Sequence, residues 1–393
     1  MRILFYLPVV TPLWFEEVIL PLVRTLRAHA EVHVLVPLLW RNTGIGTAQL
    51  TECAGLGDVH WHVVDGAGHE SLRTAPDDPE GLIAFVRSIA PDYVLCRSAE
   101  TDTAAAFPGT VRYLMEAGAP PLAMDPWALA LHEGIFDFGA MPELDADAGE
   151  QVEAAFASRW EEACDRHAHS WPYSLSRSEA LALMGLPEDR RIVAVPLEYE
   201  HEENFYPIQH RFARNLDLVA HLAAWLPPDF VLALTNHPLN RLHGADAELR
   251  GMVEGYGGRV RLVELAEAGA ASTNLLVKHC DGMVVQNSKC FAAGAFFGRP
   301  MLRMSRRRSA AWLRMHDDLD AFVRALRDGS AAVPDADAAR RWFAWRVAGE
   351  AFGAKTVGAA EFSERLRAPA SPARWEGGLA RYDQHQPRSC EDA

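Results

Sequence analysis

Three short polar segments follow predicted strands in the second half of the chain, and their side chains could bind a phosphate group. They are the glutamate-rich stretch 198–204, Asn236-His237-Pro238, and Gln286-Asn287-Ser288. Proline restricts the residue before it to an extended backbone, so His237 is held rigidly. A helix predicted after Ser288 would aim its free N–H groups and positive dipole end at the same place. This combination predicts a seat for a monophosphate or diphosphate without a metal ion.

The residues assigned to this phosphate and donor site are charged, hydroxyl or amide side chains near the strand ends: Glu198, Glu200, Asn236, His237, Arg241, Gln286, Asn287, Ser288 and Lys289. His237 is also a candidate catalytic residue, because a histidine at a rigid strand end can stabilise charge on a leaving group. A glutamate of 198–204 could grip sugar hydroxyls or take part in proton transfer. A solvated acidic loop is the alternative interpretation of that stretch.

Two more candidate catalytic residues, Glu16 and Glu17, lie in the first half of the chain. They follow the predicted strand 2–7 and a loop that ends at Trp14. A carboxylate at a strand end could serve as general base toward an acceptor. The alternative is that both merely begin a helix, where acidic residues suit the dipole. The loop lacks the Gly-x-Gly-x-x-Gly pattern of a dinucleotide site, which argues against a bound dinucleotide cofactor.

Two further polar features are less specific. His132 lies among apolar residues, where a lone histidine usually has a structural role. The densest basic run, 303–308, could receive an anionic acceptor, a lipid headgroup or the donor phosphate, or it could form a solvated turn. No Asp-x-Asp pattern occurs at a strand end, so no metal site is predicted.

The elements that must position these residues alternate along the chain. Apolar runs and helical spacing predict strands at 2–7, 32–36, 92–96, 191–196, 230–235, 259–264 and 281–285, with helices at 15–26, 81–89, 212–226 and 272–280. Residues 111–124 are predicted as a helix ending in a short strand, 122–124. Alternation of this kind predicts parallel sheets with right-handed crossovers. Ligands of such sheets bind beyond the carboxyl ends of the strands, where the three polar segments should converge.

The length of 393 residues predicts two domains of ordinary size. The predicted division is an N-terminal acceptor domain, 1–175, and a C-terminal donor domain, 176–335. Helices in 336–368 would return to the first domain, and 369–393 would form a loosely ordered tail. The boundary follows the Trp171-Pro172 break and precedes a capping box, Ser176 to Glu179. The fold class is therefore α/β, with two Rossmann-like domains facing a cleft.

Composition excludes several classes of function. A net charge of −15 argues against a nucleic-acid-binding protein, which needs clustered Lys and Arg. The scattered cysteines indicate neither a zinc site nor a disulfide framework, and reduced thiols fit a cytoplasmic protein. The start of the chain is interpreted as a buried strand rather than a signal peptide. A peripheral contact with the inner face of a membrane, through the aromatic residues of 342–345, is an alternative.

The order Val195-Pro-Leu-Glu198, Asn236-His-Pro238, Gln286-Asn-Ser288 and Gly298-Arg-Pro300 resembles the C-terminal domain of capsule polysaccharide biosynthesis glycosyltransferases. Several members of that family transfer Kdo from cytidine monophosphate. The resemblance covers about residues 190 to 305 and implies the two-domain GT-B fold. It implies phosphate contacts for His237, Asn287 and Ser288, and a donor-side role for Glu198. The family usually has a glutamine where this chain has Glu198. It also usually has a lysine shortly before the His-Pro pair, where this chain has Leu234, Thr235 and Asn236.

The expected function is therefore transfer of a sugar from a nucleotide-sugar donor, CMP-Kdo or a UDP- or GDP-sugar, to a saccharide or other acceptor. No cofactor or metal ion is expected beyond the donor substrate. Two alternatives remain at this point. One is a nucleotide-sugar epimerase or hydrolase on the same fold, and the other is a non-catalytic nucleotide-sugar-binding protein. The sequence does not predict the oligomeric state.

Overall fold

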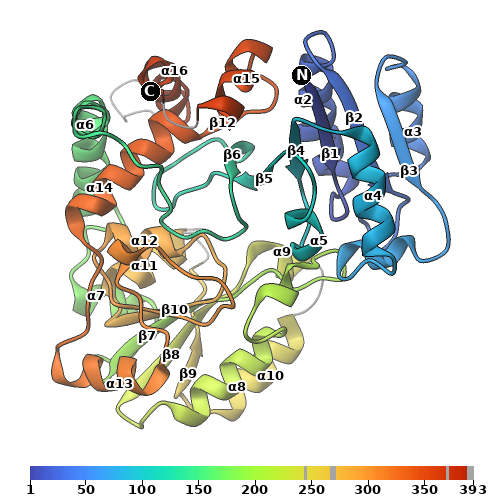
Figure 1. Cartoon of the computed structure of the whole chain (residues 1–393). Helices are drawn as coiled ribbons and strands as arrows, with labels where there is room; N and C mark the ends of the chain where they lie inside the picture. Colours follow the sequence, from blue (N-terminus) through green and yellow to red (C-terminus); the bar gives the residue numbers. More distant parts are fainter. Residues whose placement is uncertain (243–245, 266–270, 369–370, 387–393) are drawn as a thin grey trace.

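The computed structural model describes residues 1–242, 246–265, 271–368 and 371–386. Its first sheet has the strand order β12-β6-β5-β4-β1-β2-β3 (Figure 1). β1 to β5 run parallel, whereas β6 pairs antiparallel with β5, and β12 with β6. The strands of this sheet are β1 (Arg2–Tyr6), β2 (Glu31–Pro37), β3 (His60–Val64), β4 (Tyr93–Cys96), β5 (Thr110–Glu116), β6 (Ala128–His132) and β12 (Phe352–Gly353).

Strand β1 is buried and largely apolar after Arg2 because both of its faces are covered. Ile3 and Phe5 pack into one apolar cluster, and Leu4 and Tyr6 pack into another on the opposite face. Central parallel strands with helices on both faces have this composition. The helices in this part of the chain are α1 (Pro12–Trp14), the π-helical η1 (Phe15–Ile19), α2 (Leu20–Leu26), α3 (Thr47–Ala54), η2 (His69–Arg73), α4 (Pro79–Ile89) and α5 (Asp102–Ala105).

The second sheet is wholly parallel, in the order β11-β10-β7-β8-β9. Its strands are β7 (Arg191–Pro196), β8 (Phe230–Thr235), β9 (Val260–Leu262), β10 (Gly282–Val285) and β11 (Met301–Arg303). The helices before, between and after them are α7 (Arg177–Leu183), η3 (Tyr206–Gln209), α8 (Asn215–Trp225), α9 (Pro238–Leu242), α10 (Asp246–Gly255), α11 (Ala271–His279), α12 (Phe291–Phe296), η4 (Ala311–Leu313) and α13 (Leu319–Asp328).

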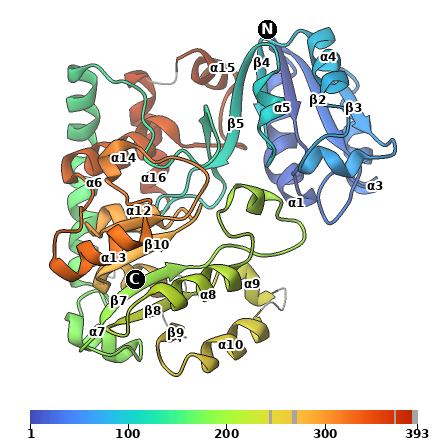
Figure 2. The ribbon, with the colours of Figure 1, turned by 60° about the horizontal axis from the view of Figure 1, so that its bottom comes forward.

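The predicted α/β fold class is confirmed, since the chain forms two Rossmann-like units, each built on a largely or wholly parallel sheet. Figure 2 shows β2 and β3 of the first sheet and β7 to β9 of the second sheet in different parts of the molecule. The capping box at the start of α7 also forms, since the Ser176 side chain and the Glu179 carboxylate bond each other's backbone N–H groups. The predicted strands 191–196, 230–235 and 281–285 correspond to β7, β8 and β10.

Residues 110–116 differ from the prediction, because they form strand β5 instead of a helix. Residues 122–124 are not a strand. The run Val111-Arg-Tyr113 continues with alternate residues facing opposite sides of the sheet: Val111 and Tyr113 join one cluster and Leu114 the other. Pairing with β4 on one side and β6 on the other outweighs local helical spacing. As a result Glu116 ends a strand at the edge where a ligand would bind.

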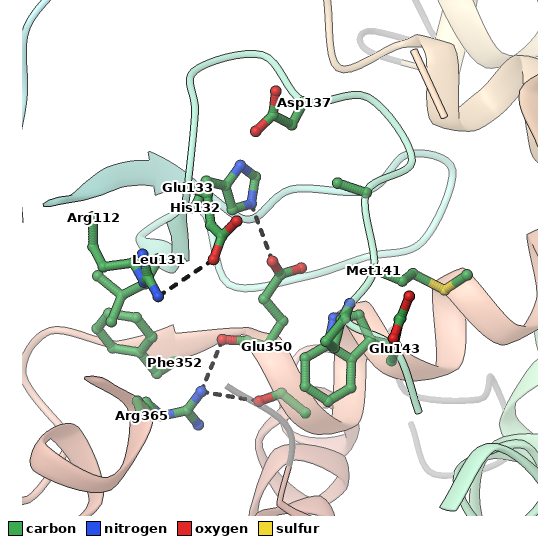
Figure 3. A pocket seen from close by; sticks show the side chains of 14 residues that line it. Arg112, Leu131, His132, Glu133, Asp137, Met141, Glu143, Glu350, Phe352 and Arg365 are labelled. Atoms are coloured by element: carbon green, nitrogen blue, oxygen red, sulfur yellow. Dashed lines mark hydrogen bonds and ion pairs between the residues drawn. The ribbon is translucent and has the colours of Figure 1, made fainter. Parts of the chain in front are cut away.

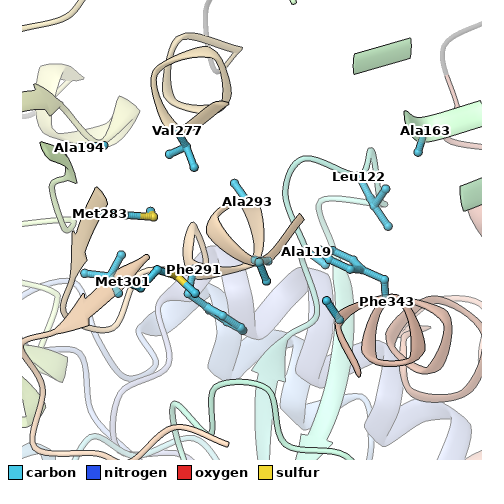
Figure 4. Packing of buried hydrophobic residues seen from close by; sticks show 14 of the residues in the cluster. Ala119, Leu122, Ala163, Ala194, Val277, Met283, Phe291, Ala293, Met301 and Phe343 are labelled. Carbon is cyan, nitrogen blue, oxygen red and sulfur yellow. The ribbon is translucent and has the colours of Figure 1, made fainter. Parts of the chain in front are cut away.

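The largest apolar cluster joins the middle of the chain to its C-terminal helices (Figure 4). Helix α6 (Ala146–His169) lies beside α14 (Ala336–Trp345), and its Trp160 contacts Phe296 of α12 and Phe343 of α14. The predicted first domain, 1–175, includes α6, yet these contacts attach it to later elements. No helix in the described part of the chain is long and apolar enough to cross a membrane.

After α14 the chain returns to the first sheet. The π-helical η5 (Arg346–Glu350) leads into β12, which pairs with β6, and α15 (Ala359–Arg367) follows. The predicted loose tail is wrong for 371–386, where η6 (Pro372–Arg374) and α16 (Trp375–Asp383) form. Trp375, Leu379 and Tyr382 recur at helical spacing, and all three are buried in the largest cluster. Residues 369–370 and 387–393 lie outside the described residues.

Two adjacent glycines of α16 give a matched test of this docking. A Cβ at Gly378 would lie 2.0 Å from the Ala348 carbonyl oxygen, whereas one at Gly377 would meet only the end of Arg381 at 3.7 Å. We expect Gly378→Ala to lower the free energy of unfolding by about 1–3 kcal/mol, the usual effect of overpacking. Gly377→Ala should raise it by about 0.5–1 kcal/mol through helix propensity. Urea unfolding of both variants measures these effects, and a stabilised Gly378→Ala would contradict the close packing.

Candidate functional site

The carboxyl ends of β7, β8 and β10 bring the three polar segments together. Glu198 follows β7, and its Oε1 accepts a hydrogen bond of 2.8 Å from the backbone N–H of Asn287, which follows β10. Burial of the Glu198 carboxyl raises its pKa to about 7. The backbone N–H groups of 286–288 and the Arg303 guanidinium favour the ionised form and only partly offset burial. Glu198 is therefore poised to gain or lose a proton near neutral pH.

The predicted phosphate seat at a helix start is not arranged as the sequence suggests. Helix α12 begins at Phe291, three residues beyond Ser288, and the Asn287 N–H already bonds Glu198. The Ser288 hydroxyl accepts a hydrogen bond from the Cys290 N–H at 3.3 Å. A carboxylate thus occupies the place where an anionic ligand was expected, because it is the nearest anion to these N–H groups.

Asn287 is held on one side and left without a partner on the other. Its Oδ1 accepts hydrogen bonds from the Ser305 hydroxyl at 2.6 Å and from Arg303 Nη2 at 3.2 Å. Its side-chain Nδ2 is buried and has no acceptor among the described residues, and the residue is only 4% exposed. A buried unpaired donor costs about 1–3 kcal/mol. Such a group, fixed in orientation by two bonds to its oxygen, is suited to an incoming ligand acceptor.

His237 is a neutral hydrogen-bond donor at the end of β8. Its Nδ1 accepts the Leu239 N–H at 3.3 Å, so the proton of the neutral ring resides on Nε2. Burial lowers the pKa of His237, and the Lys289 cation lowers it further against an opposing effect of Glu116. The ring lies beside Tyr199, with centroids 5.4 Å apart.

Lys289 connects the two halves of the protein. Its Nζ forms an ion pair with Glu116 at the end of β5, and Arg97 Nη2 lies 3.8 Å from the same carboxylate. The Lys289 charge holds the pKa of Glu116 at about 2, with burial opposing it and Arg97 helping. Arg97 also stacks on Trp14, 4.3 Å from its ring centroid.

We call Arg97, Glu116, Glu198, His237, Asn287 and Lys289 the interdomain cluster. The sequence predicted four of its six members, and it indicated polar groups in 97–102 at the same edge. Glu116 was missed because residues 111–124 were interpreted as a helix and a short strand. The alternation of side chains through 111–115 was the signal that could have identified it.

The remaining donor-site candidates are used within the fold. The Glu200 carboxylate accepts the Asn215 N–H at the start of α8 at 3.0 Å, and Asn236 Oδ1 accepts a bond of 2.8 Å from Asn240. Gln286 exchanges two hydrogen bonds with the backbone of Phe212. These contacts fix the loops that carry the cluster residues, so Glu200, Asn236 and Gln286 have a structural role in the site.

Arg241 and the two N-terminal glutamates lie apart from the cluster contacts. Arg241 pairs with Glu264 at 2.5 Å. Glu16 accepts a hydrogen bond of 2.6 Å from Gln49 of α3, and Glu17 forms an ion pair with Lys355. No contact between Glu16 or Glu17 and the cluster is found among the described residues. Their predicted role as general bases stays a prediction.

Two arginines of the basic run 303–308, Arg303 and Arg307, make contacts within the fold, whereas Arg306 and Arg308 are exposed to solvent. Arg303 is buried, stacks 3.8 Å from the Phe138 ring centroid and donates to the Phe136 carbonyl oxygen at 2.8 Å. Arg307 donates to Gln209 at 2.9 Å and to the Thr101 hydroxyl at 2.8 Å. Both arginines therefore join the second sheet to segments that follow strands of the first.

A cavity of about 450 Å³ lies where the C-terminal helices meet β6 and the segment 137–143 (Figure 3). His132 Nε2 is 3.1 Å from Glu350, whose other oxygen pairs with Arg346 at 2.9 Å. Burial opposes ionisation of Glu350, but Arg346 and His132 outweigh it and lower the carboxyl pKa. The lining residues are Arg112, Leu131, His132, Glu133, Asp137, Ala140, Met141, Pro142, Glu143, Trp345, Gly349, Glu350, Phe352 and Arg365.

The chemistry of this cavity suits a hydroxylated ligand. Carboxylates of Glu133 and Asp137 face it, and they can accept hydrogen bonds from hydroxyl groups. The Trp345 Nε1 and His132 Nδ1 atoms are buried without partners among the described residues. Glu350 belongs to the π-helical η5, a type of segment that is frequent at functional sites. His132 thus lines a cavity, which its sequence context did not indicate.

Comparisons of the sequence with family models and with curated proteins gave no match. Among solved structures, KpsC of Thermosulfurimonas dismutans, a beta Kdo 2,7 transferase, is 11% identical, with 84% of this chain and 97% of that chain covered and a TM-score of 0.42. Anabaena HepE in complex with UDP and glucose is 11% identical over 94% of this chain and 100% of that one, with a TM-score of 0.33. ADP-heptose heptosyltransferase II of E. coli is 13% identical over 79% and 90%, with a TM-score of 0.25. Identities and TM-scores this low do not identify a reaction, so the function is inferred from the residues of the site.

Proposed function

We propose that this protein is a glycosyltransferase that takes a sugar from a nucleotide-sugar donor bound at the carboxyl edge of the second sheet. The observation that carries the proposal is the buried, unpartnered Nδ2 donor of Asn287, which lies on the same segment as Lys289, the cation whose charge acts on the neutral His237. Three donors of this kind match the oxygens of a phosphate group. Their position beyond parallel strand ends is where such sheets bind ligands.

The proposed reaction breaks the bond between the sugar carbon and the donor phosphate oxygen. The bonding electrons leave with the phosphate, and an acceptor oxygen forms the new bond while its proton passes to a base. Lys289, the His237 Nε2–H and the Asn287 amide would stabilise the charge that develops on the phosphate. With these donors supplied by the chain, we propose that transfer needs no metal ion or cofactor.

Glu198 would control entry of the donor phosphate. Its ionised carboxylate holds the Asn287 N–H and repels a second anion at the same place. Because burial raises the Glu198 pKa to about 7, protonation near neutral pH removes this repulsion. Donor binding is thus proposed to be coupled to proton uptake by Glu198.

The acceptor side is proposed to lie against the first sheet. The cavity lined by Glu133 and Asp137 is linked to the cluster by Arg303, which donates to the carbonyl oxygen of Phe136, the residue before Asp137, and to Asn287 Oδ1. A saccharide is the acceptor class that carboxylates and a tryptophan ring suit best. Of the two predicted bases, Glu16 is the better candidate, since its partner Gln49 is neutral whereas Glu17 is paired with a cation. A place in surface polysaccharide or glycoconjugate synthesis would follow.

A thermal-shift screen of the full chain against cytidine, uridine and guanosine nucleotides tests the donor class. We expect one class to raise the melting temperature by several degrees at saturation, because a ligand that binds only the folded state stabilises it. The matching sugar nucleotide, incubated with and without saccharide acceptors, then separates the activities by mass spectrometry. Donor consumed without an acceptor would indicate a hydrolase or epimerase. A bound donor that no acceptor consumes would indicate a binding protein, and no stabilisation by any nucleotide would refute the proposal.

A further inference from the structure

Three side chains that could bind a metal ion meet at the amino ends of β2 and β3. Glu31 and His33 are two residues apart on β2 and so face the same side of the sheet. The parallel register places His60 of β3 directly beside His33. This is the edge of the first sheet opposite the carboxyl ends that carry the interdomain cluster. β2 and β3 lie side by side at one side of the molecule in Figure 1.

The ligand atoms of these side chains are already close to the spacing that zinc requires. His33 Nε2 lies 3.0 Å from Glu31 Oε1, and His60 Nε2 lies 3.9 Å from the same oxygen. All three atoms fall within 4.8 Å of one another. Ligands about 2.0–2.1 Å from a tetrahedral ion lie about 3.4 Å apart. The two separations from Glu31 Oε1 bracket that value. The His33 and His60 rings are stacked with centroids 4.4 Å apart, so binding requires the exposed His60 ring to turn toward the ion.

Neighbouring groups leave the correct atoms available to a metal. His33 Nδ1 is 3.0 Å from His62 Nε2, so the other nitrogen, Nε2, is the one that can coordinate. The second oxygen of Glu31, Oε2, pairs with Arg2 at 2.9 Å and leaves Oε1 facing the histidines. Metal-binding histidines and carboxylates in proteins are usually oriented by such outer hydrogen bonds. His33 is 8% exposed and fixed in place, whereas the His60 side chain is 55% exposed and gives access from solvent.

We propose that Glu31, His33 and His60 form a zinc-binding site with its fourth position open to solvent. Two imidazoles and one carboxylate are typical zinc ligands. In the metal-free state His33 Nε2–H donates to Glu31. On binding, the ion takes the place of this proton, and His33 then carries its proton on Nδ1. His62 Nε2 accepts from that N–H, so the His62 proton resides on its own Nδ1. An ion here would bridge β2 to β3, the edge strand of the sheet in the described residues, which is paired on one side only. The site would therefore clamp an edge strand, at a distance from sugar transfer.

Zinc titration of the chelator-treated full chain by calorimetry tests this site. We expect one zinc ion per chain to bind at micromolar concentrations and to raise the melting temperature. Cobalt(II) should give the intense visible absorption of a tetrahedral ion. His60→Ala, a change at an exposed strand end, should weaken binding at least tenfold while the metal-free melting temperature is kept. Glu31→Gln should weaken it similarly, because the ligand charge is lost.

His169→Ala is the matched control, since His169 is an exposed histidine at the end of α6. It should bind zinc like the wild type. Equal losses in His60→Ala and His169→Ala, or binding only at millimolar zinc, would overturn the proposal. The readout is zinc affinity, so it is independent of whether the protein transfers a sugar.

Discussion

Between pH 4.5 and pH 8 a Glu198→Gln variant is expected to gain stability relative to the wild type, by up to about 3 kcal/mol. The Glu198 pKa is about 7 in the folded protein and 4.5 without burial. The folded state therefore binds more protons than the unfolded state in this range, and the wild type loses stability as pH rises from 4.5 through 7. Glutamine does not ionise, and its oxygen can still accept the Asn287 N–H.

Urea unfolding of both proteins at several pH values measures this difference. Contributions of all other titrating groups cancel in the comparison, so only the Glu198 contribution remains. A difference that stays constant across the range would show that Glu198 is an ordinary solvated carboxylate. The matched control is Glu202→Gln, since Glu202 lies in the same loop and is outside the cluster contacts described above.

The same substitution bears on the proposed donor site. In the wild type, nucleotide affinity should rise as pH falls from 8 to 6, because protonation of Glu198 removes its repulsion of the phosphate anion. Glu198→Gln should bind nucleotide at pH 8 about as tightly as the wild type does at pH 6. Fluorescence or calorimetric titration measures this. An unchanged pH dependence in the variant would place the phosphate elsewhere.

The second large effect is expected at His237, where His237→Ala should lower turnover at least tenfold with the fold intact. In the proposed reaction the neutral ring would offer its Nε2–H to the leaving phosphate, since Nδ1 already accepts the Leu239 N–H. Loss of a donor aimed at developing charge typically costs about a hundredfold or more. His237→Asn keeps a side-chain N–H donor and should recover part of the loss. Steady-state kinetics with the donor found by the nucleotide screen measures both variants.

The control for this prediction is His385→Ala. His385 is exposed, lies just after α16, and has no described contact with the interdomain cluster. This variant should retain wild-type turnover. Melting temperatures of all three variants distinguish a catalytic loss from unfolding. Turnover of His237→Ala equal to that of the wild type would remove His237 from the mechanism.

The pattern of apolar and polar residues was sufficient to predict elements whose structure depends mainly on their own residues. Strands β7, β8 and β10 are apolar apart from a terminal Arg191 and Thr235, and the predicted polar segments begin within two residues of each strand end. The local pattern does not predict the structure of segments whose conformation depends on contacts with residues distant in the sequence. Residues 110–116 form a strand because β4 and β6 pair with them. Residues 375–383 form a buried helix that packs against Ala348, at a position where only a glycine, Gly378, leaves room.

Sequence alone therefore determined the α/β alternation, the strand ends that carry Glu198, His237 and Asn287, and the expectation that these ends converge. Only the tertiary structure decided which groups meet there. It set Glu198 on the N–H of Asn287 and Lys289 against Glu116 from the other sheet. Strand register likewise aligned His33 with His60, which no spacing along the chain reveals. The reason is physical: periodicity fixes which face a side chain occupies, while contacts between distant segments depend on sheet order and on packing between domains.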